Sequence, residues 1–445
     1  MESKDRAHVL IGHETTKAMW ALFDQAVVSL ANFALNLALA RYASPEVYGQ
    51  FVIVFALLLF VYSSIQAPLT LDPLIILGGK INDKETQFMY TRRTLGFHFL
   101  ISLVSIVVLL IVGALSWTFQ NLIYARAMLQ ASVPLLFMNL RFLIRCFYIM
   151  EGEFAKAFRS DLSVLIVVGL GAIGLVYLRE PGNWAAVALM AIAEVAATLL
   201  LMTTKRKQLV WIISGLVSDI KAQPMVWKWK EARQNWDYGK WLLLANSANY
   251  AYQSAQFLLL PVFVSLASLA GYRACYLLAQ PIYLFTTGLE AYAWHRSAER
   301  MKSGGVRELQ GFLWKMTCSV STLILSYALL IGLTSRVVLE TIYAGKFGEF
   351  AVLTWFFTTA SLFAFWGKML GTGLRVLEAT NALFSSALCT GVVGVVAFLL
   401  LTRSVGVTGA AISYALSSFL SVALLSMYWH RKAGVGSVEA KVVDL

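Results

Sequence analysis

The sequence predicts an all-α polytopic membrane protein with twelve transmembrane helices in two six-helix bundles related by a pseudo-twofold axis. Hydrophobic residues make up 59% of the 445-residue chain and charged residues 13%, whereas a soluble domain is about 45–50% apolar and about 25% charged. Apolar runs of roughly 20 residues, the length that crosses a bilayer, recur along the whole chain. The polar phrase Leu30–Asn36 inside the first run is echoed at Leu244–Tyr250. Such an internal repeat is typical of transporters whose halves line one cavity; packing positions in unrelated helices are the alternative.

The apolar runs define the expected spans in order. They lie near 19–40, 49–71, 94–118, 122–144, 161–178, 183–203, 237–263, 271–295, 311–334, 350–371, 380–402 and 406–429. Met1–Lys17 is polar and mixed in charge, and the first run is too long for the apolar core of a cleavable signal peptide. We therefore take that run as the first span.

Lysine and arginine indicate the orientation. If the N-terminus is cytoplasmic, 29 of the 36 Lys and Arg residues fall in tails, loops and helix ends on the cytoplasmic side. Because positively charged loops stay in the cytoplasm, both termini are predicted to be cytoplasmic. The basic residues are scattered over several groups. The net charge of +12 therefore indicates contact with anionic lipid and not nucleic-acid binding.

The longest hydrophilic stretch, residues 205–236, divides the expected spans six and six. It alternates lysines with tryptophans, which is typical of an amphipathic segment at the headgroup level; a plain solvated linker is the alternative. The predicted organisation is an N-terminal bundle at 1–204, this cytoplasmic linker at 205–236, a C-terminal bundle at 237–432 and a cytoplasmic tail at 433–445.

No pattern for a cofactor, a metal or a disulfide is visible. The four cysteines lie singly, without CxxC or Cys/His spacing, and the five histidines are dispersed. His98 lies well inside a span, where a lone histidine is more often a packing residue than a proton relay. External loops are short and leave no room for a catalytic domain, so we do not expect an enzyme.

Function must then reside in polar groups at membrane depth, which are costly in hydrocarbon unless they face a partner or a water-filled cavity. In the first span Gln25, Asn32 and Asn36 are spaced by seven and four residues, so they share one helical face. A second amide stripe on the seventh span comprises Asn246, Asn249, Gln253 and Gln256. These stripes are wider than helix packing needs, and they predict the lining of a substrate cavity.

Charged residues supply further candidates. Arg41 and Arg273 lie at the outer ends of spans, and Arg141 and Arg145 at an inner end. A guanidinium that faces a cavity can bind phosphate bidentately; for Arg41 and Arg273, snorkelling to lipid headgroups is the alternative.

Three acids also lie at membrane depth. Asp24 and Glu290 lie near cytoplasmic ends, and Arg296 is near enough in the sequence to be a candidate partner of Glu290. Glu194, near the centre of its span, either couples to protons or pairs with a basic residue of a neighbouring helix.

Prolines fall inside two spans at related places. Gln66-Ala67-Pro68 lies in the second span and Gln280-Pro281 in the eighth. A proline frees a carbonyl and bends a helix. Bending at equivalent places in both halves suits alternating access, and an inert kink is the alternative.

The turn after the first span carries a family resemblance. Its sequence, Ala40-Arg41-Tyr42-Ala43-Ser44-Pro45-Glu46-Val47-Tyr48-Gly49-Gln50-Phe51, resembles the ARxxSPExYGxF-like turn of Wzx-type polysaccharide-transport flippases. Those proteins belong to the multidrug/oligosaccharidyl-lipid/polysaccharide exporter superfamily. Similar turns follow in family order at Ile342–Phe347, Leu374–Asn381 and Gly406–Ile412.

The resemblance implies two six-helix bundles with a cavity formed mainly by spans 1, 2, 7 and 8. It also implies alternating-access flipping of undecaprenyl-pyrophosphate-linked oligosaccharide across a bacterial cytoplasmic membrane, for exopolysaccharide, capsule or O-antigen. Substrate binding would fall to Asn32, Asn36, Arg41, Asn246, Asn249, Gln253, Gln256 and Arg273. The eighth span lines the family's cavity and the sixth does not, so we rank Asp24 and Glu290 above Glu194 as ion-coupling residues. The chain has twelve expected spans instead of fourteen and lacks the cavity arginines of the lipid II branch, which argues against a peptidoglycan precursor.

Two alternatives stay open. A cation-coupled multidrug exporter of the same fold would be expected to have a more apolar, aromatic cavity. A membrane-embedded polysaccharide polymerase or acyltransferase would need a large external loop or a well-placed intramembrane histidine. The expected partners are the lipid-linked oligosaccharide, membrane lipids, and polymerase and chain-length proteins of the same pathway. We expect no nucleic acid partner and a monomer.

Overall fold

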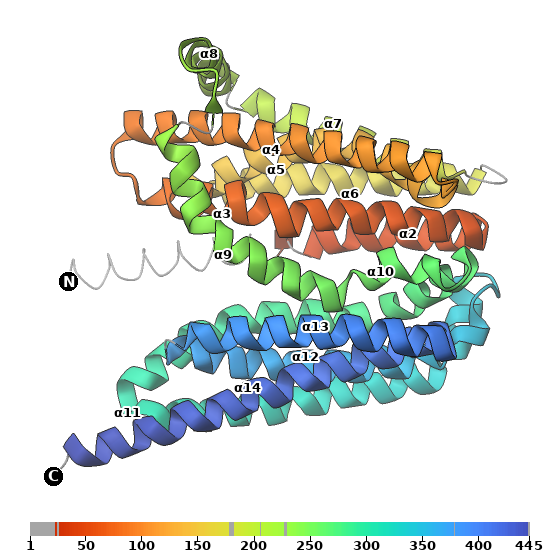
Figure 1. Ribbon diagram of the computed structural model, residues 1–445, viewed down its shortest axis with the longest axis vertical. Helices are drawn as coiled ribbons and strands as arrows, with labels where there is room; N and C mark the ends of the chain where they lie inside the picture. The colour runs from red at the N-terminus through yellow and green to blue at the C-terminus, as the bar shows by residue number, and fades with distance from the viewer. Residues whose placement is uncertain are drawn as a thin grey trace, which may run out of the picture. The chain divides into compact units, whose positions relative to one another are not determined.

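The structure is a computed structural model that describes residues 23–443 apart from 25, 178–181, 205, 227–228 and 378. Throughout this described part every regular element is helical (Figure 1), as the composition predicts. The chain divides into two compact units, Met1–Ser247 (unit 1) and Ala248–Leu445 (unit 2). The division falls inside helix α9 (Lys230–Gln253). The domain boundaries expected from hydropathy stay a prediction, and Gln25 lies outside the described residues.

Eight helices among the described residues are long and apolar enough to cross a membrane. They are Pro45–Lys80, Lys84–Thr118, Leu122–Met150, Phe154–Leu175, Trp184–Thr203, Arg296–Ile342, Asn381–Val405 and Val407–Lys432. The described part of the first expected span is a shorter apolar helix, Ala26–Tyr42. The expected spans near 237–263, 271–295 and 350–371 are largely helical but more polar. The chain is therefore a multi-pass membrane protein, and the twelve-span count stays a prediction.

Unit 1 is built around helix α5 (Leu122–Met150), which supplies two of the charged residues described below. Its neighbours are α2 (Pro45–Phe60), α4 (Lys84–Thr118), α6 (Phe154–Tyr177) and α7 (Asn183–Thr204). Figure 1 shows these helices running alongside one another. A core of Leu71, Leu74, Tyr90, Leu143, Cys146, Phe147 and Ile212 packs between α3 (Asp72–Ile76), α4, α5 and α8 (Arg206–Ala222).

The turn that carries the family resemblance is a capped helix start. The Ser44 side chain accepts a hydrogen bond from the Val47 backbone N–H at 3.3 Å, and Pro45 occupies the first position of α2. Serine at the cap satisfies an otherwise free donor, and proline at the first position has the helical φ already set. The Ser-Pro pair therefore ends the first helix and begins the second within a few residues.

A widened helical segment follows α2. Residues Val61–Leu71 form a π-helix with Pro68 inside it. In a π-helix the N–H of residue i bonds to the carbonyl of residue i−5, so Pro68, which has no N–H, leaves the Ser63 carbonyl without its helical donor. Asn246 of α9 supplies the donor, with Nδ2 at 3.1 Å from the Ser63 oxygen. Gly239 of α9 also approaches the Pro68 carbonyl so closely that a Cβ there would collide with it. The irregular helix predicted at Pro68 is therefore present, and α9 packs directly against it.

The segment expected as a linker is largely a packed helix of unit 1. Arg92 of α4 binds Asp219 of α8 at 2.7 Å, and Leu216 and Trp229 pack against Phe97. The exposed residues of α8 include the apolar Val210, Val217 and Ile220. The segment is therefore a packed helix of unit 1, and its location at the membrane surface stays a prediction.

Unit 2 is dominated by α11 (Leu266–Ile342), which is interrupted at Gly304 and Gly305. Gly305 has φ 63° and ψ −157°, a conformation that essentially only glycine adopts. The element is therefore a hairpin with arms 266–303 and 306–342. Helix α12 (Leu353–Val376) packs against α11 and α14 (Val407–Val443), and α13 (Thr380–Val405) packs against α14.

Candidate functional site

Unit 2 contains a cavity of about 220 Å³ lined by the end of α9, the 266–303 arm of α11, α12, α13 and α14. Many of the lining residues carry a polar group, set among apolar atoms that supply the larger part of the wall. The carboxamides are Asn249, Gln253 and Gln280, the charged groups are Glu290, Lys368 and Arg375, and the hydroxyls include Tyr276, Tyr283, Thr286, Ser361, Ser386 and Ser418. The buried Ser386 hydroxyl has no hydrogen-bond partner in the described part of the chain. The three more polar expected spans thus line this cavity together with α13 and α14.

The charged groups of this cavity contact one another. Glu290 Oε2 lies 3.5 Å from Lys368 Nζ, and Glu290 Oε1 lies 3.3 Å from an Arg375 nitrogen. Lys368 also donates to the Thr287 hydroxyl at 2.8 Å. Optimal charge-assisted contacts are shorter, at about 2.7–2.9 Å. The three groups therefore form a loose cluster with one net positive charge, and its contacts can exchange with those of a ligand.

Arg296, the candidate partner of Glu290, pairs with another acid. Arg296 pairs with Glu299 at 2.7 Å, on the same helix and three residues away. Residues three apart are neighbours on a helix surface, so Arg296 has a local acid available, whereas Glu290 meets Lys368 and Arg375 of α12.

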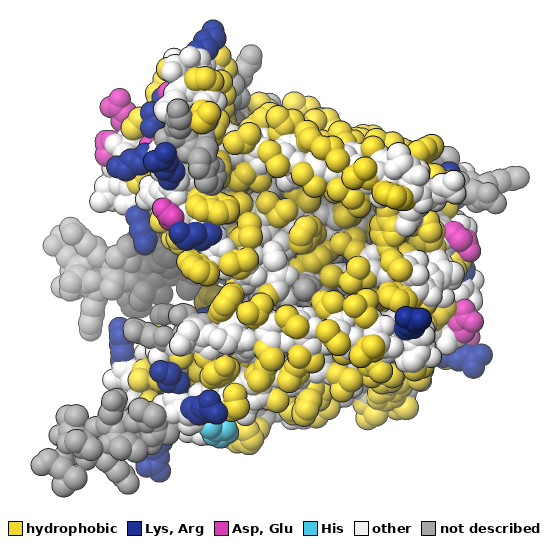
Figure 2. Space-filling model, viewed as in Figure 1, with side chains coloured by type: hydrophobic (Ala, Val, Ile, Leu, Met, Phe, Trp, Pro, Cys, Tyr) yellow, Lys and Arg dark blue, Asp and Glu magenta, His cyan; other side chains and the backbone are white. Residues whose placement is uncertain are grey.

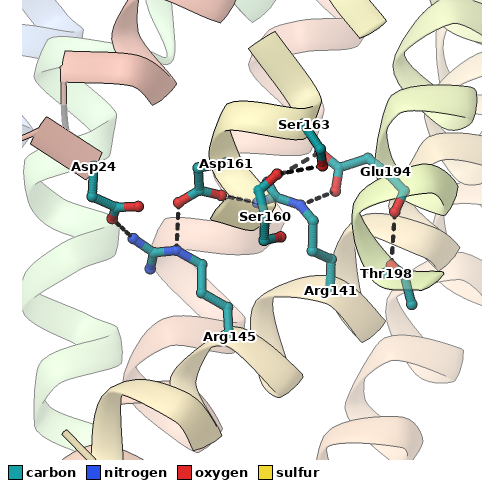
Figure 3. Close-up of polar contacts among 8 residues, drawn as sticks. All are labelled: Asp24, Arg141, Arg145, Ser160, Asp161, Ser163, Glu194 and Thr198. Carbon is teal, nitrogen blue, oxygen red and sulfur yellow. Dashed lines mark hydrogen bonds and ion pairs between the residues drawn. The ribbon is translucent and has the colours of Figure 1, made fainter. Parts of the chain in front are cut away.

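Unit 1 contains a chain of buried charges, which Figure 3 shows. Arg145 of α5 contacts Asp24 and binds Asp161 of α6, with its Nε at 2.7 Å from Asp161 Oδ2. Arg141, one turn earlier on α5, contacts the same Asp161 and binds Glu194 of α7, with a second guanidinium contact at 3.2 Å. We call these five residues the charge network. The exposed fraction of its side chains runs from 0% for Asp161 to 15% for Arg145.

The charge network contains more acidic than basic residues. Three carboxylates face two guanidinium groups, so full ionisation leaves one excess negative charge in a buried place. An uncompensated buried charge costs several kcal/mol. The Oδ1 atom of Asp24 is buried and has no hydrogen-bond partner among the described residues. The charge network is therefore suited to take up one proton or one monovalent cation.

The structure connects Asp24 and Glu194, which sequence reasoning considered one at a time. Asp24 and Glu194 are the two ends of one chain of contacts, and the pairing alternative for Glu194 is the one observed, with Arg141. Arg141 is fully engaged by two carboxylates, so its interpretation as a phosphate ligand is wrong. Sequence reasoning missed Asp161 because it marks the boundary of an expected span. The i, i+4 spacing of Arg141 and Arg145 was the available signal for two stacked ion pairs.

The predicted amide stripes divide between the cavity and the fold. Asn249 and Gln253 line the cavity. Gln256 is buried and accepts a hydrogen bond from the Tyr272 hydroxyl. Asn36 is also buried: its Oδ1 accepts from the Tyr48 hydroxyl at 3.2 Å and its Nδ2 donates to the backbone oxygen of Asn32 at 2.8 Å.

The side chain of Asn32 is exposed, and that of Asn246 donates to the π-helix. Helix packing therefore accounts for Asn36, Asn246 and Gln256. Ligand binding by the stripes stays a prediction.

The two outer arginines differ in environment. Arg41 is half-buried and lies over the Tyr42 ring at 5.8 Å. Arg273 is 5% exposed and lies between the rings of Phe257, at 4.9 Å, and Tyr276, at 5.3 Å. A buried guanidinium between two rings does not snorkel to the surface. Arg273 instead packs against the ring of Tyr276, a residue that lines the cavity.

His98 is a packing residue, as predicted. It is buried, with Nδ1 at 2.7 Å from the Thr70 hydroxyl and Nε2 at 3.1 Å from the Asn139 carbonyl.

Comparisons with known proteins give the class of fold. The sequence matches no model of a known protein family and no curated protein. The fold resembles the inward-facing conformation of a multidrug resistance MATE family transporter of the MOP superfamily, with TM-score 0.69 and 13% identity over 92% of this chain and 95% of that chain. It also resembles the lipid II flippase MurJ in an inward closed conformation, with TM-score 0.65 and 12% identity over 93% of this chain and 87% of that chain. A eukaryotic MATE transporter, AtDTX14, matches with TM-score 0.57 and 12% identity over 95% of this chain and 98% of that chain. The chain thus has the fold that MATE and MurJ transporters share.

Proposed function

We propose that this protein is a transporter of the MOP superfamily. In our proposal it flips undecaprenyl-pyrophosphate-linked oligosaccharide across a bacterial cytoplasmic membrane by alternating access, for exopolysaccharide, capsule or O-antigen synthesis. The observation that carries the proposal is the lining of the unit 2 cavity, where carboxamides, hydroxyls and one excess positive charge lie together. Sugar hydroxyls and phosphate bind through such hydrogen-bonding and cationic groups.

The cavity volume limits what unit 2 holds. Its roughly 220 Å³ is below the about 300–1,000 Å³ of a drug-sized pocket, so it accommodates one sugar-sized or phosphate-sized part of the substrate. Asn249 and Gln253 would hydrogen-bond that part, and Lys368 and Arg375 would attract its charge. Asn32, whose side chain is exposed, and Arg41, which is half-buried, are proposed as further contacts outside this cavity.

Ion coupling is proposed at Asp24 and at Glu290. The charge network around Asp24 has an excess carboxylate, which favours uptake of a proton or cation. The cluster around Glu290 has an excess positive charge, which favours an anion, so Asp24 is the better supported of the two coupling residues. Because Glu194 shares the charge network with Asp24, neutralising either acid removes the excess negative charge. We therefore expect Glu194→Gln, like Asp24→Asn, to weaken the dependence of transport on an imposed gradient.

A cation-coupled multidrug exporter is the second candidate. It is favoured by the higher TM-score to a MATE transporter than to MurJ and by Tyr276, Tyr283 and Tyr414 in the cavity wall.

Proteoliposomes distinguish the two candidates. Polyprenyl-pyrophosphate oligosaccharide, placed in one leaflet, is scored by lectin access from the other side, and ethidium export is scored in parallel. Flipping without ethidium export, reduced in the Asn249→Ala/Gln253→Ala double variant, supports the flippase. Ethidium export without flipping refutes it.

We propose that the protein lies in the bacterial inner membrane with both termini in the cytoplasm. It would act as a monomer, with the polymerase and chain-length proteins of the same pathway as partners. Cysteines introduced at Ser44 and at Gln223, both exposed, test the topology in a background without native thiols. An impermeant reagent should label them from opposite sides, and labelling from one side would refute the orientation.

A further inference from the structure

Unit 2 has a second hollow, separate from the polar cavity. It is a groove of about 730 Å³ between the 306–342 arm of α11 and helices α12 and α14. Both α11 and α14 pack on α12, so α12 forms the floor of the groove. Small residues keep it open: a Cβ added at Gly311 would meet nothing within 4 Å. We call it the α11–α14 groove.

The polarity of this groove changes along its length. Arg307, Gln310 and His430 line one end, and Trp314, Met369 and Val422 line the rest. From Arg307 to Thr317 the helix rises about 15 Å, at about 1.5 Å per residue. That length is about half of the roughly 30 Å hydrocarbon core of a bilayer. The groove therefore matches one leaflet, with a basic end at headgroup level and an apolar wall beside the acyl chains.

The basic end of the groove has unneutralised charge. Arg307 makes no ion pair with any described residue, and the same holds for Lys315 beside it, whereas the neighbouring Arg300 is neutralised by Glu308 at 3.0 Å. Figure 2 shows Lys and Arg side chains gathered beside hydrophobic ones at one end of unit 2. Trp314 is 69% exposed, as expected of a tryptophan that borders lipid.

We propose that the α11–α14 groove is a binding site for one anionic phospholipid of the cytoplasmic leaflet. Its phosphate would lie at Arg307 and His430, with Lys315 adding charge, and one acyl chain would lie over Gly311 against Trp314 and Met369. The charge of the rim selects an anionic over a zwitterionic headgroup, and the apolar wall requires a lipid and not free phosphate. The site does not depend on what the protein transports.

Native mass spectrometry of the purified full-length protein tests this site. Phosphatidylglycerol and phosphatidylcholine are titrated separately, and the bound lipid is counted. Wild type should bind one phosphatidylglycerol in preference to phosphatidylcholine. Arg307→Gln should lower phosphatidylglycerol affinity about fivefold, because a basic residue at a lipid surface contributes about 1 kcal/mol. It should lower phosphatidylcholine affinity less, because the choline of that lipid offsets the charge of its phosphate. Gly311→Leu should lower the binding of both lipids by occupying the groove.

Lys302→Gln is the matched control, since Lys302 is an exposed basic residue at the same end of the hairpin but outside the groove. It should leave both affinities unchanged. The proposal is overturned if wild type binds the two lipids equally, if Lys302→Gln acts like Arg307→Gln, or if Gly311→Leu changes nothing. A polyprenyl phosphate that displaces phosphatidylglycerol and binds more tightly would assign the groove to the carrier lipid and equally refute a phospholipid site.

Discussion

The charge network makes an asymmetric prediction about stability. An ordinary buried ion pair is harmed similarly by removal of either partner, because each removal leaves one buried charge unpaired. Here three carboxylates share two guanidinium groups. Replacing any one acid by its amide leaves two acids and two arginines, which is a neutral set. Replacing Arg141 by Gln leaves three acids around Arg145, with two excess negative charges.

The expected magnitudes follow from burial. Arg141 has a side chain that is 4% exposed and contacts two carboxylates, so Arg141→Gln should cost about 3–5 kcal/mol of unfolding free energy. Glu194→Gln keeps the shape of the side chain and loses charge-assisted hydrogen bonds, each contributing about 1.5–3 kcal/mol. It also relieves the excess charge, so its net cost should be clearly smaller than that of Arg141→Gln.

Reversible unfolding in mixed micelles measures both variants. The assay compares wild type, Arg141→Gln, Glu194→Gln and the double variant, with Arg336→Gln as an exposed arginine control. The double variant should be less destabilised than the sum of the single variants, because its remaining residues carry two acids and one arginine instead of three and one. Equal costs for Arg141→Gln and Glu194→Gln would refute the reasoning, since the network would then behave as a simple pair.

Three further predictions concern single positions. Asn246→Ala removes the donor to the Ser63 carbonyl, so it should lower the free energy of unfolding by about 1–3 kcal/mol in the same assay. Asn32→Ala, at an exposed position, should change that free energy by less than about 0.5 kcal/mol. Equal costs would contradict the role of Asn246 at the π-helix. Glu290→Gln frees Lys368 and Arg375 from their carboxylate, so anionic competitors such as pyrophosphate should inhibit transport more strongly than in wild type, and unchanged inhibition would exclude this cavity as the anion site. Hydrogen bonds from Thr86 lower the pKa of the α4 cap Asp83 below its usual 3.8. Wild type should therefore be more stable than Asp83→Ala by a constant amount above the unfolded-state pKa of 3.8. This difference should fade as the pH falls through the lower pKa of the folded state. A difference in unfolding midpoint that does not depend on pH would refute the cap.

Local features of this fold were accessible from the sequence. Mean hydropathy and the apolar runs predicted helices throughout, because a bilayer satisfies backbone hydrogen bonds only within helices or closed barrels. Ser44 and Pro45 marked a helix start, Pro68 marked an irregular helical turn, and the periodicity of Asn249 and Gln253 placed both on a face that lines a cavity. Each of these signals is contained in a few consecutive residues.

Pairings between distant residues were decided only by the tertiary structure. Asp24 meets Arg145, 121 positions away, Glu194 meets Arg141, 53 away, and Arg375 meets Glu290, 85 away. Sequence reasoning gave Glu290 a candidate partner on its own helix and judged Asp24 and Glu194 separately. A buried charge takes its partner from whichever helix packs beside it, and hydropathy identifies the helices that enter the membrane without fixing which of their faces meet.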